Sequence, residues 1–485
     1  MKIGFSNEKY VKLQSEKIKE RIKMFDKLYL EIGGKLFSDN HAERVLPGFV
    51  HDSKIKMFQE LKDILEIIFC INANDIEKNK IRAEYGITYD IEILNIINNA
   101  TKLGFKVNSV VITLYNNQKS VDKFIKKLER QNIKTYIHKF TKGYPTDIET
   151  IVSEEGYGEN EYITTTQKLI LVNAPGPCSG KLATCLSQLY HEHQRNVNAG
   201  YAKFETFPVW NLPLKHPINI AYEAATADLK DRNMIDSFHL EKYNIPSVNY
   251  NRDIETFPIV KTILRKITNK DVYYSPTDMG VNMVGFCIED DELVSEAAKK
   301  EIIRRYYNEL KNYKLGQTDY DTVEKIKILM NELEINTSFL KVSDVAKEKS
   351  KEKNAHLIAL ELHNKKYITG RETELLSASS SLIINAIKEL SKIPDDIKLL
   401  SPKVLEPILK LKTKEQKLNL QEVLIALSIC SVTNPVIEKA LTKLNNLKYT
   451  EAHSTFILNE NEIKTLKELN INITCEPNFY TNELY

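Results

Sequence analysis

Short apolar runs alternate with amphipathic stretches through the first half of the chain, and this alternation constrains the fold more than any other feature. Helical patterns such as 90–104 and 120–132 lie between the apolar runs. The strand-like runs are YLEI (29–32), EIIFCINA (66–73), SVVITLY (109–115), KTYIHKF (134–140), ETIVS (149–153) and KLILVNA (168–174). Strands that alternate with helices form crossover units and a mostly parallel sheet. The sequence therefore predicts an α/β fold with a Rossmann-like, mostly parallel sheet in the N-terminal region, in which 168–174 is a central strand.

The pattern changes further along the chain, and this change suggests separate domains. Long helical patterns cover 291–316 and 321–335, and a strand–helix–strand pattern covers 449–477. A chain of 485 residues is long enough for roughly two to four domains. We expect a Rossmann-like α/β domain over 1–235, a mainly helical middle segment over 236–335 and a smaller C-terminal α/β domain over 336–485.

Charge and composition exclude several classes of protein. Lys and Arg number 68 against 66 Asp and Glu, whereas dedicated nucleic-acid binders carry a concentrated basic excess. No apolar run approaches the roughly 18 residues of a membrane span, and the polar start lacks the apolar core of a signal peptide. Six dispersed cysteines without a CxxC pair predict free thiols and no metal site. We expect a cytoplasmic protein without nucleic-acid or membrane partners, and a homo-oligomer only because oligomers are common.

The stretch that follows the apolar run KLILVNA resembles a phosphate-binding loop. Such loops follow the pattern G-x-x-x-x-G-K-[ST], in which backbone N–H groups and a lysine hold the phosphates and the hydroxyl binds magnesium. The corresponding residues here are Pro175-Gly176-Pro177-Cys178-Ser179-Gly180-Lys181-Leu182. Gly180 and Lys181 match the pattern, and a helical apolar stripe begins directly afterwards. We predict a phosphate site made of Gly176, Cys178, Ser179, Gly180 and Lys181, with a purely structural turn as the open alternative.

Two departures from the pattern bear on the ligand. Pro175 stands where the first glycine belongs, and Leu182 stands where the magnesium-binding hydroxyl belongs. Pro175 and Pro177 have no N–H to donate, so the loop can surround one phosphoryl group better than a triphosphate. We therefore expect no obligatory cofactor; a nucleotide remains an open ligand, and magnesium is not required.

Three residues are candidates for proton transfer. His191 and His193 follow the loop in the sequence HEH, but residues two apart on a helix point about 200° apart and cannot bind one metal ion together. His191 is retained as an acid or base, because histidine titrates near neutral pH. His216, in a proline-rich strap, and Asp278, in a turn-rich loop, are the other two candidates. For each of the three, a structural role is the alternative.

Several stretches are similar to a bacterial family of uncharacterised proteins that carry a domain of unknown function. They are GGKLFSDNHAERVLPGF, INANDIEKNKIRAEYGITYD, APGPCSGKLATCLSQLYHEH, YAKFETFPVWNLPLKHPINIAYEAATADL, SPTDMGVN and EAHSTFIL with LNINITCEP. The similarity covers nearly the whole chain. It implies a Rossmann-like N-terminal region, a helical middle and a smaller C-terminal α/β unit, and it implies no activity. Cys178 departs from the glycine expected in the loop.

Three functions remain open at this stage. The chain is an enzyme of phosphoryl-transfer or hydrolase type acting on a phosphorylated small molecule, a non-catalytic sensor of a nucleotide or phospho-metabolite, or an interaction protein whose loop is only structural. Phosphate binding separates the first two functions from the third, and turnover separates the first from the second. We favour the enzyme.

Overall fold

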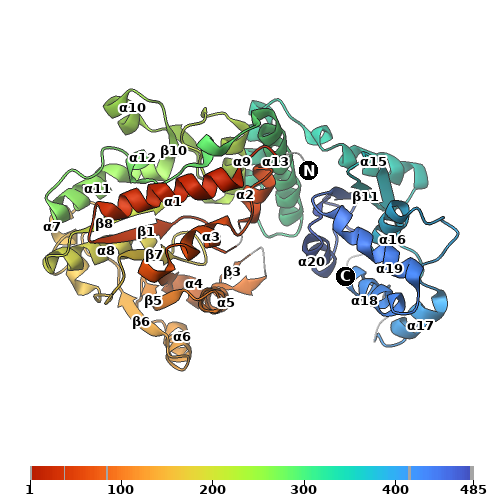
Figure 1. Ribbon diagram of the computed structural model, residues 1–485, viewed down its shortest axis with the longest axis horizontal. Helices are drawn as coiled ribbons and strands as arrows, with labels where there is room; N and C mark the ends of the chain where they lie inside the picture. Colours follow the sequence, from red (N-terminus) through yellow and green to blue (C-terminus); the bar gives the residue numbers. More distant parts are fainter. Residues whose placement is uncertain (1–2, 38, 83–85, 413–416, 481–485) are drawn as a thin grey trace. The chain divides into compact units, whose positions relative to one another are not determined.

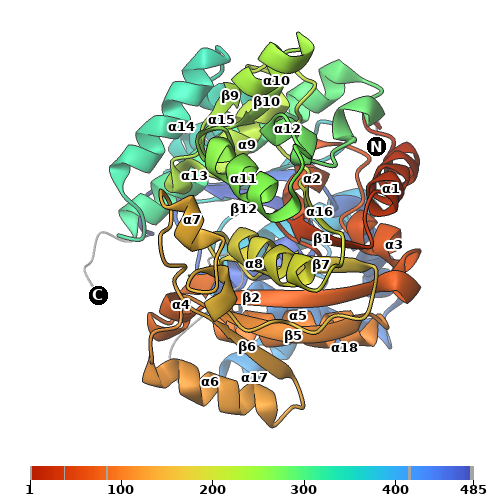
Figure 2. The same ribbon diagram turned by 90° about the vertical axis from the view of Figure 1, so that its left-hand side faces the viewer.

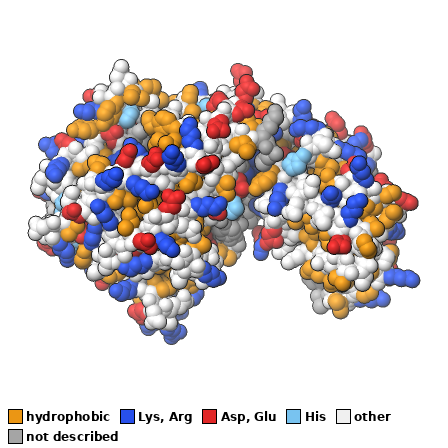
Figure 3. Space-filling view, in the orientation of Figure 1, with side chains coloured by type: hydrophobic (Ala, Val, Ile, Leu, Met, Phe, Trp, Pro, Cys, Tyr) orange, Lys and Arg blue, Asp and Glu red, His pale blue; other side chains and the backbone are white. Residues whose placement is uncertain are grey.

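The computed structural model describes residues 3–37, 39–82, 86–412 and 417–480, and it divides into two compact units, Met1–Ala298 and Lys299–Tyr485. Figure 1 labels their helices and strands. Basic and acidic side chains are interspersed over the face shown in Figure 3, in line with their nearly equal numbers. In the part of the chain that is described, no helix is both long and apolar enough to cross a membrane.

The N-terminal unit is built on a six-stranded parallel sheet. Its strands are β1 (Lys27–Ile32), β2 (Leu65–Asn72), β5 (Lys106–Thr113), β6 (Lys134–His138), β7 (Leu169–Asn173) and β8 (Ala199–Phe204). They lie in the order β6-β5-β2-β7-β1-β8. All five β7 residues are buried, and β7 pairs with β2 on one side and β1 on the other. This confirms both the predicted parallel sheet and the central position of 168–174.

The helices of this unit lie on both faces of the sheet. They are α1 (Asn7–Lys23), α2 (Asn40–Val45), α3 (Ser53–Gln59), α4 (Ala73–Glu77), α5 (Tyr89–Lys102), α6 (Lys119–Glu129), α7 (Ile148–Ile151), α8 (Lys181–Gln194), α9 (Pro217–Ala225), α10 (Ser237–Tyr243), α11 (Asn251–Thr268) and α12 (Pro276–Met279). Figure 2 shows α8 in front of the sheet with α11 beside it, and side chains of both helices share a core with β7 and β1. The short pairs β3 (Ile81–Arg82) with β4 (Ile87–Thr88), and β9 (Asn233–Ile235) with β10 (Val248–Tyr250), complete the unit.

One predicted strand is wrong. The run 149–153 was expected to be a strand, but residues 148–151 form the helix α7. The Asp147 side chain accepts a hydrogen bond from the Thr150 N–H at 3.1 Å and so caps the start of this helix. An N-cap of this kind satisfies N–H groups that a helix end leaves open, and it outweighs the β propensity of a short run.

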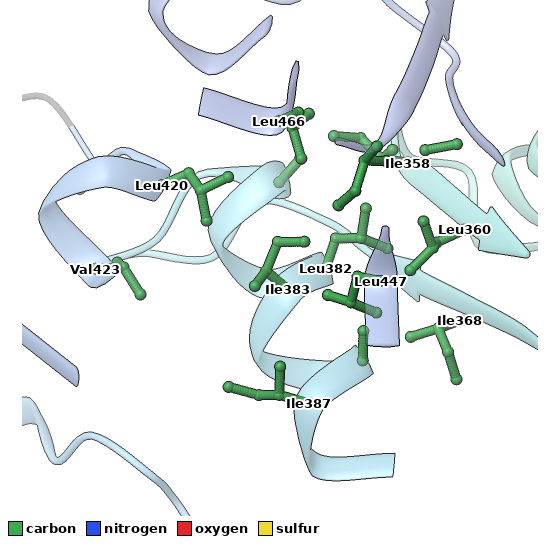
Figure 4. Close-up of a cluster of buried hydrophobic side chains, with 14 of the residues drawn as sticks. Ile358, Leu360, Ile368, Leu382, Ile383, Ile387, Leu420, Val423, Leu447 and Leu466 are labelled. Carbon is green, nitrogen blue, oxygen red and sulfur yellow. The ribbon is translucent and has the colours of Figure 1, made fainter. Parts of the chain in front are cut away.

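The long helix α13 (Asp291–Lys314) spans the boundary between the two units, and the C-terminal unit continues from it. That unit contains α14 (Tyr320–Glu332), α15 (Lys341–Lys353), β11 (Ile358–Glu361), β12 (Tyr367–Gly370), α16 (Ala378–Ser391), α17 (Pro402–Leu409), α18 (Leu420–Ser431), α19 (Pro435–Leu441), β13 (Glu451–Ser454), α20 (Glu460–Glu468) and β14 (Asn472–Cys475). Its mixed sheet has the order β12-β11-β13-β14. Leu382 and Ile383 of α16 pack against this sheet in the core drawn in Figure 4. A smaller C-terminal α/β unit was expected, and it is present.

A buried polar network lies beside the core of the C-terminal unit. His453 is fully buried; its Nδ1 lies 2.8 Å from Thr474 Oγ1 and its Nε2 lies 3.1 Å from Glu476 Oε1. Lys347 Nζ lies 2.9 Å from the same Glu476 oxygen and 3.1 Å from the Tyr307 hydroxyl. Burial lowers the pKa of His453, so the carboxylate of Glu476 and the ammonium of Lys347 carry the charge of this network.

Candidate phosphate-binding site

The loop that joins β7 to α8 is anchored by side chains from the ends of two other strands. Asn72, the last residue of β2, donates a hydrogen bond from Nδ2 to the Cys178 carbonyl at 3.3 Å. Thr113, the last residue of β5, donates from Oγ1 to the Ser179 carbonyl at 3.0 Å. The Ser179 hydroxyl donates to the Gly176 carbonyl at 2.8 Å, inside the loop. The sheet edge therefore binds carbonyl groups of the loop, and the Ser179 hydroxyl serves the turn itself.

The amide groups at the start of α8 are open. The first backbone hydrogen bond across this end runs from the Thr184 N–H to the Gly180 carbonyl at 2.9 Å. The N–H groups of residues 181–183 donate to no other residue that the structure describes. Open amides at a helix start, together with the positive end of the helix dipole, favour an anion. Cys178 and Gly180 have φ of 55° and 79°, so the loop reaches α8 through two left-handed residues.

Two cations flank the loop on the side of α8. Lys181 is largely buried, and its Nζ lies 4.0 Å from Glu31 Oε1 on β1. Arg252, in the first turn of α11, lies 3.9 Å from Cys178 Sγ through Nη1 and is held by Asp231 at 2.7 Å through Nε. Both cations therefore have protein carboxylates as partners and remain beside the open amides.

A third cation approaches the loop from β3 and α5. Lys80 Nζ lies 5.2 Å from the centre of the Tyr89 ring. The Tyr89 hydroxyl lies so close to Gly176 that a Cβ at this position would come within 2.4 Å of it. Glycine is thus required at 176 for close approach of the phenol, and the Lys80 ammonium beside this phenol is paired with Asp75 Oδ1 at 3.4 Å.

A cluster of charged side chains continues from Lys181 along the carboxyl ends of β1 and β8. The Tyr201 hydroxyl donates to Glu31 Oε2 at 2.8 Å. Lys203 Nζ lies 3.0 Å from Glu205 Oε1 and also binds Asp253 of α11. Tyr201, Lys203 and Glu205 point to the same face because side chains alternate along and beyond a strand. We call Glu31, Lys203, Glu205 and Asp253 the carboxylate–lysine cluster.

Burial adjusts the proton affinity of this cluster. It raises the pKa of Glu205 to about 7, against the opposing effect of the Lys203 ammonium. Burial alone would lower the pKa of Lys203, but the charge of Asp253 and then of Glu205 outweighs burial and raises it. The Glu205 side chain keeps 21% of its surface exposed. It can therefore exchange a proton with solvent or a ligand near neutral pH, which is the range in which a general acid or base works best.

The three predicted proton-transfer residues are not brought together with the loop. His191 lies ten residues after Lys181, about 15 Å along α8, and its Nε2 contacts the Asn160 carbonyl at 2.8 Å. His193 contacts a different carbonyl, that of Ala199, at 3.0 Å, so the two rings of HEH diverge as helical spacing predicts. In the described part of the chain, no three His, Cys, Asp or Glu residues are placed to hold a metal ion.

His216 and Asp278 have structural partners elsewhere in the unit. His216 accepts a hydrogen bond at Nδ1 from the Ile218 N–H at 3.2 Å and so caps α9, while its Nε2 lies 3.0 Å from Asp291. Asp278 accepts from the Tyr274 N–H and from the Tyr243 hydroxyl, both at 3.0 Å. These contacts hold the strap and the turn-rich loop in place.

Sequence reasoning did not find the carboxylate–lysine cluster, although a signal was present. Lys203 and Glu205 stand two apart at the end of the run AGYAKFE, and Glu31 is the one charge in YLEI. A charged residue at the carboxyl end of a buried strand faces the edge of the sheet where ligands bind. The pairing of β1 with β7 and β8, which brings these residues together, is not readable from the local sequence.

The strand order places the loop where open α/β sheets bind ligands. From β2 the chain moves to β5 on one side, and from β7 it moves past β1 to β8 on the other. Right-handed crossovers in opposite directions put α5 and α8 on opposite faces. The switch point therefore lies between the carboxyl ends of β2 and β7, and such points are the usual ligand sites of this architecture. The chain is thus an α/β protein whose strand–loop–helix connection from β7 to α8 lies at a topological switch point.

Comparison with known proteins identifies the family. Residues 3–334 match the N-terminal domain of unknown function DUF1846 and residues 338–485 match its C-terminal domain. The chain belongs to the DUF1846 family. It is 54% identical to the UPF0371 protein CLL_A2797 of Clostridium botulinum (strain Eklund 17B / Type B) and 54% identical to a UPF0371 protein of Clostridium tetani. Each alignment covers 100% of this chain and 99% of the relative.

Proposed function

We propose that the loop over 174–184 binds a phosphoryl group and that the protein is an enzyme acting on a phosphorylated small molecule. The observation that carries the proposal is the set of open amides at residues 181–183, located at the switch point and beside the ammonium of Lys181. A loop that serves only as a turn has no need for open amides and an ammonium group at the same place. Arg252 and Lys80 lie nearby but are paired with Asp231 and Asp75, so the open amides and the start of α8 are what favour an anion.

The carboxylate–lysine cluster supplies the chemistry in this proposal. Glu205 lies at the end of β8, two strands from β7, so roughly 10 Å separates the two strands. Glu205 is the group we assign to proton transfer, since its partly exposed side chain follows the carboxyl end of β8 and burial raises the pKa of its carboxyl. In a hydrolysis its carboxylate takes a proton from the attacking water, whose oxygen bonds to phosphorus as the bond from phosphorus to the leaving oxygen breaks. The leaving oxygen takes up a proton from solvent. Lys203, which is itself bound by Asp253, holds the Glu205 carboxylate in position.

The geometry favours a single phosphoryl group over a magnesium triphosphate. Leu182 offers no oxygen to a metal, and the Ser179 hydroxyl is bound to the Gly176 carbonyl. The proposed reaction is accordingly a phosphoryl transfer or hydrolysis without a tightly held magnesium. A nucleotide with one phosphate remains among the ligands to be tested.

One observation favours the structural alternative. Lys181 already has Glu31 as a carboxylate partner at 4.0 Å, and Asn72 and Thr113 hold the loop without any ligand. A loop with these contacts keeps its shape as a simple turn. The two functions differ in one measurable property, which is the affinity of the loop for phosphate.

The test measures binding of inorganic phosphate, sugar phosphates and nucleotides by calorimetry, with and without magnesium. Lys181→Met should lower phosphate affinity about ten- to a hundredfold, because a charge-assisted hydrogen bond contributes about 1.5–3 kcal/mol. Lys27→Met is the matched control: Lys27 also pairs with a buried glutamate, Glu192, at 2.8 Å, but at the opposite end of β1. The control should bind phosphate like the wild type.

Two results would overturn the proposal. Either no phosphorylated compound binds the wild type, or the two lysine variants bind phosphate equally well. Turnover is measured separately as release of inorganic phosphate from the compounds that bind. Binding without release, and without an effect of Glu205→Gln on any reaction, would identify a sensor instead of an enzyme.

A further inference from the structure

An open depression lies at the carboxyl edge of the sheet, next to the phosphate loop. Its volume is about 820 Å³. Its lining comes from α4, from the connection between β5 and α6, from the first turn of α6 and from the stretch that follows β6. It comprises four side-chain amides, one hydroxyl, two opposite charges and two apolar side chains: Asn74, Asn116, Asn117 and Gln118; Ser120; Glu77 and Lys119; Leu114 and Phe140. None of these residues belongs to the loop or to the carboxylate–lysine cluster.

The depression is continuous with the loop through two strands. Thr113 binds the Ser179 carbonyl, and the next residue, Leu114, lines the depression. Asn72 binds the Cys178 carbonyl, and Asn74, two residues later, lines the depression. The strands β2, β5 and β6 are the first, second and third neighbours of β7 on this side, so the lining residues follow strands that lie about 5–15 Å from β7. Asn74 and Leu114, which follow the two nearer strands, are the lining residues next to the loop contacts.

The walls of the depression are rich in amides and are held in place. Gln118 donates from Nε2 to Asn74 Oδ1 at 3.3 Å, and the Asn116 N–H donates to Gln118 Oε1 at 2.8 Å. Leu114 and Asn117 have φ of 53° and 57°, in the left-handed region. Asparagine adopts this conformation readily, whereas leucine does so only where the surroundings hold it there. The backbone at Leu114 and the two hydrogen bonds of Gln118 therefore hold the start of the connection from β5 to α6 in place.

The chemistry of the lining points to hydroxyl groups. Side-chain amides offer donors and acceptors at one position, which suits hydroxyls, because these also donate and accept. Phe140 has 64% of its surface exposed and supplies one ring face for an apolar C–H surface. A nucleobase is usually enclosed by apolar and aromatic walls. This open depression is lined mainly by amides, a hydroxyl and two charged side chains, and it offers only one aromatic ring and one leucine among the described lining residues.

We propose that this depression binds the sugar part of a sugar phosphate whose phosphoryl group is held by the loop over 174–184. The inference rests on the proposed function and adds the class of substrate to it. Asn74, Asn116 and Asn117 hydrogen-bond the sugar hydroxyls, and Phe140 packs against the sugar ring.

The experiment compares three probes by calorimetry on the full chain: inorganic phosphate, glucose 6-phosphate and adenosine monophosphate. Phe140→Ala removes an exposed ring, and Asn117→Gly removes an amide while permitting the left-handed backbone. Each variant should lower the affinity for glucose 6-phosphate about threefold to tenfold, which corresponds to the loss of one net hydrogen bond or contact. The affinity for inorganic phosphate should stay unchanged. Asn132→Gly is the control, since Asn132 has the same φ of 57° and lies at the end of α6.

The outcomes separate this inference from the proposed function. If inorganic phosphate and both organic probes fail to bind, the phosphate loop and this inference fail together. If phosphate binds but glucose 6-phosphate binds no tighter, or if the two variants match Asn132→Gly, the sugar site is refuted and the loop stands. Tighter binding of adenosine monophosphate that depends on Phe140 would show a nucleotide site instead.

Discussion

Replacing Glu476 by glutamine should show how much the buried network of the C-terminal unit stabilises the fold. Burial alone would raise the pKa of Glu476, but hydrogen bonds from His453 and Lys347 outweigh it and lower the pKa from 4.5 to about 2. Each pKa unit corresponds to about 1.4 kcal/mol, so this shift amounts to at most about 3.4 kcal/mol of unfolding free energy. Glu476 is 19% exposed, and solvent screening reduces the expected value to about 2 kcal/mol.

The pH dependence has a definite sign. A carboxylate whose pKa is lowered by folding stabilises the protein above its unfolded pKa, and that stabilisation is lost as pH falls through the folded pKa. The difference in unfolding free energy between the wild type and Glu476→Gln should therefore be full at pH 6–7. It should shrink between pH 4.5 and pH 2, the window set by the two pKa values, and be nearly absent below it.

Native-state hydrogen exchange is the suitable assay, because it reports on β13 and β14 within the intact chain. Glu352→Gln is the matched control: Glu352 pairs with Lys349 at 2.7 Å but is 59% exposed, so its loss should cost at most about 0.5 kcal/mol. Equal protection of β13 in the two variants at pH 7 would refute the reasoning. If the wild type stays more stable than Glu476→Gln by the same amount down to pH 2, the reasoning is refuted as well, because the carboxylate charge would then not be the source of the added stability.

Three further outcomes are expected. Gly180→Ala should destabilise the protein more than Gly104→Ala. Both glycines have φ of 79°, so each substitution should cost about 1–2 kcal/mol of left-handed strain in thermal unfolding. Only at Gly180 would the added Cβ also come within 2.8 Å of Thr113 and clash with it. Cys178→Gly should keep phosphate affinity and change the unfolding free energy by less than about 1 kcal/mol, since relief of strain at φ 55° and added unfolded-state entropy oppose each other. In denaturant titrations, Glu205→Gln should gain stability relative to the wild type as pH rises from 4.5 to 7. A carboxyl whose pKa is raised by folding costs the wild type stability once the unfolded carboxyl ionises. If the difference in unfolding free energy between the two proteins stays unchanged across that range, Glu205 is not a buried, proton-binding group.

The sheet was predictable because its strands carry their signal locally. Near-continuous apolar runs such as LEIIFCIN and LILVN mark strands buried on both faces, and the structure places both inside the sheet. The loop was predictable for a similar reason, since a buried strand, Gly180 and a helical stripe follow one another in sequence. ETIVS was misread because the capping carboxylate of Asp147 acts through one hydrogen bond and not through hydrophobic periodicity.

The candidate site was less predictable because it depends on long-range pairing. Glu31 and Lys181 are far apart in sequence and meet only because β1 lies beside β7. The choice of His191 and His216 used side-chain chemistry alone. Which carbonyl or carboxylate each ring meets is decided by the packing of α8 and α9, which no local pattern reports.

The position of β1 in the sheet also has a consequence for the synthesis of the protein. β1 pairs with β7 and β8 and with no other described strand, so both of its edges stay open until residues 169–204 have been made. At about 5–20 residues per second, this delay lasts roughly 7–30 s. Throughout this time an apolar strand with two unpaired edges is exposed, and such strands associate readily with other chains. A nascent chain that stalls before β7 therefore presents a surface that chaperones recognise, and the loop from β7 to α8 can form only after β7 has been made.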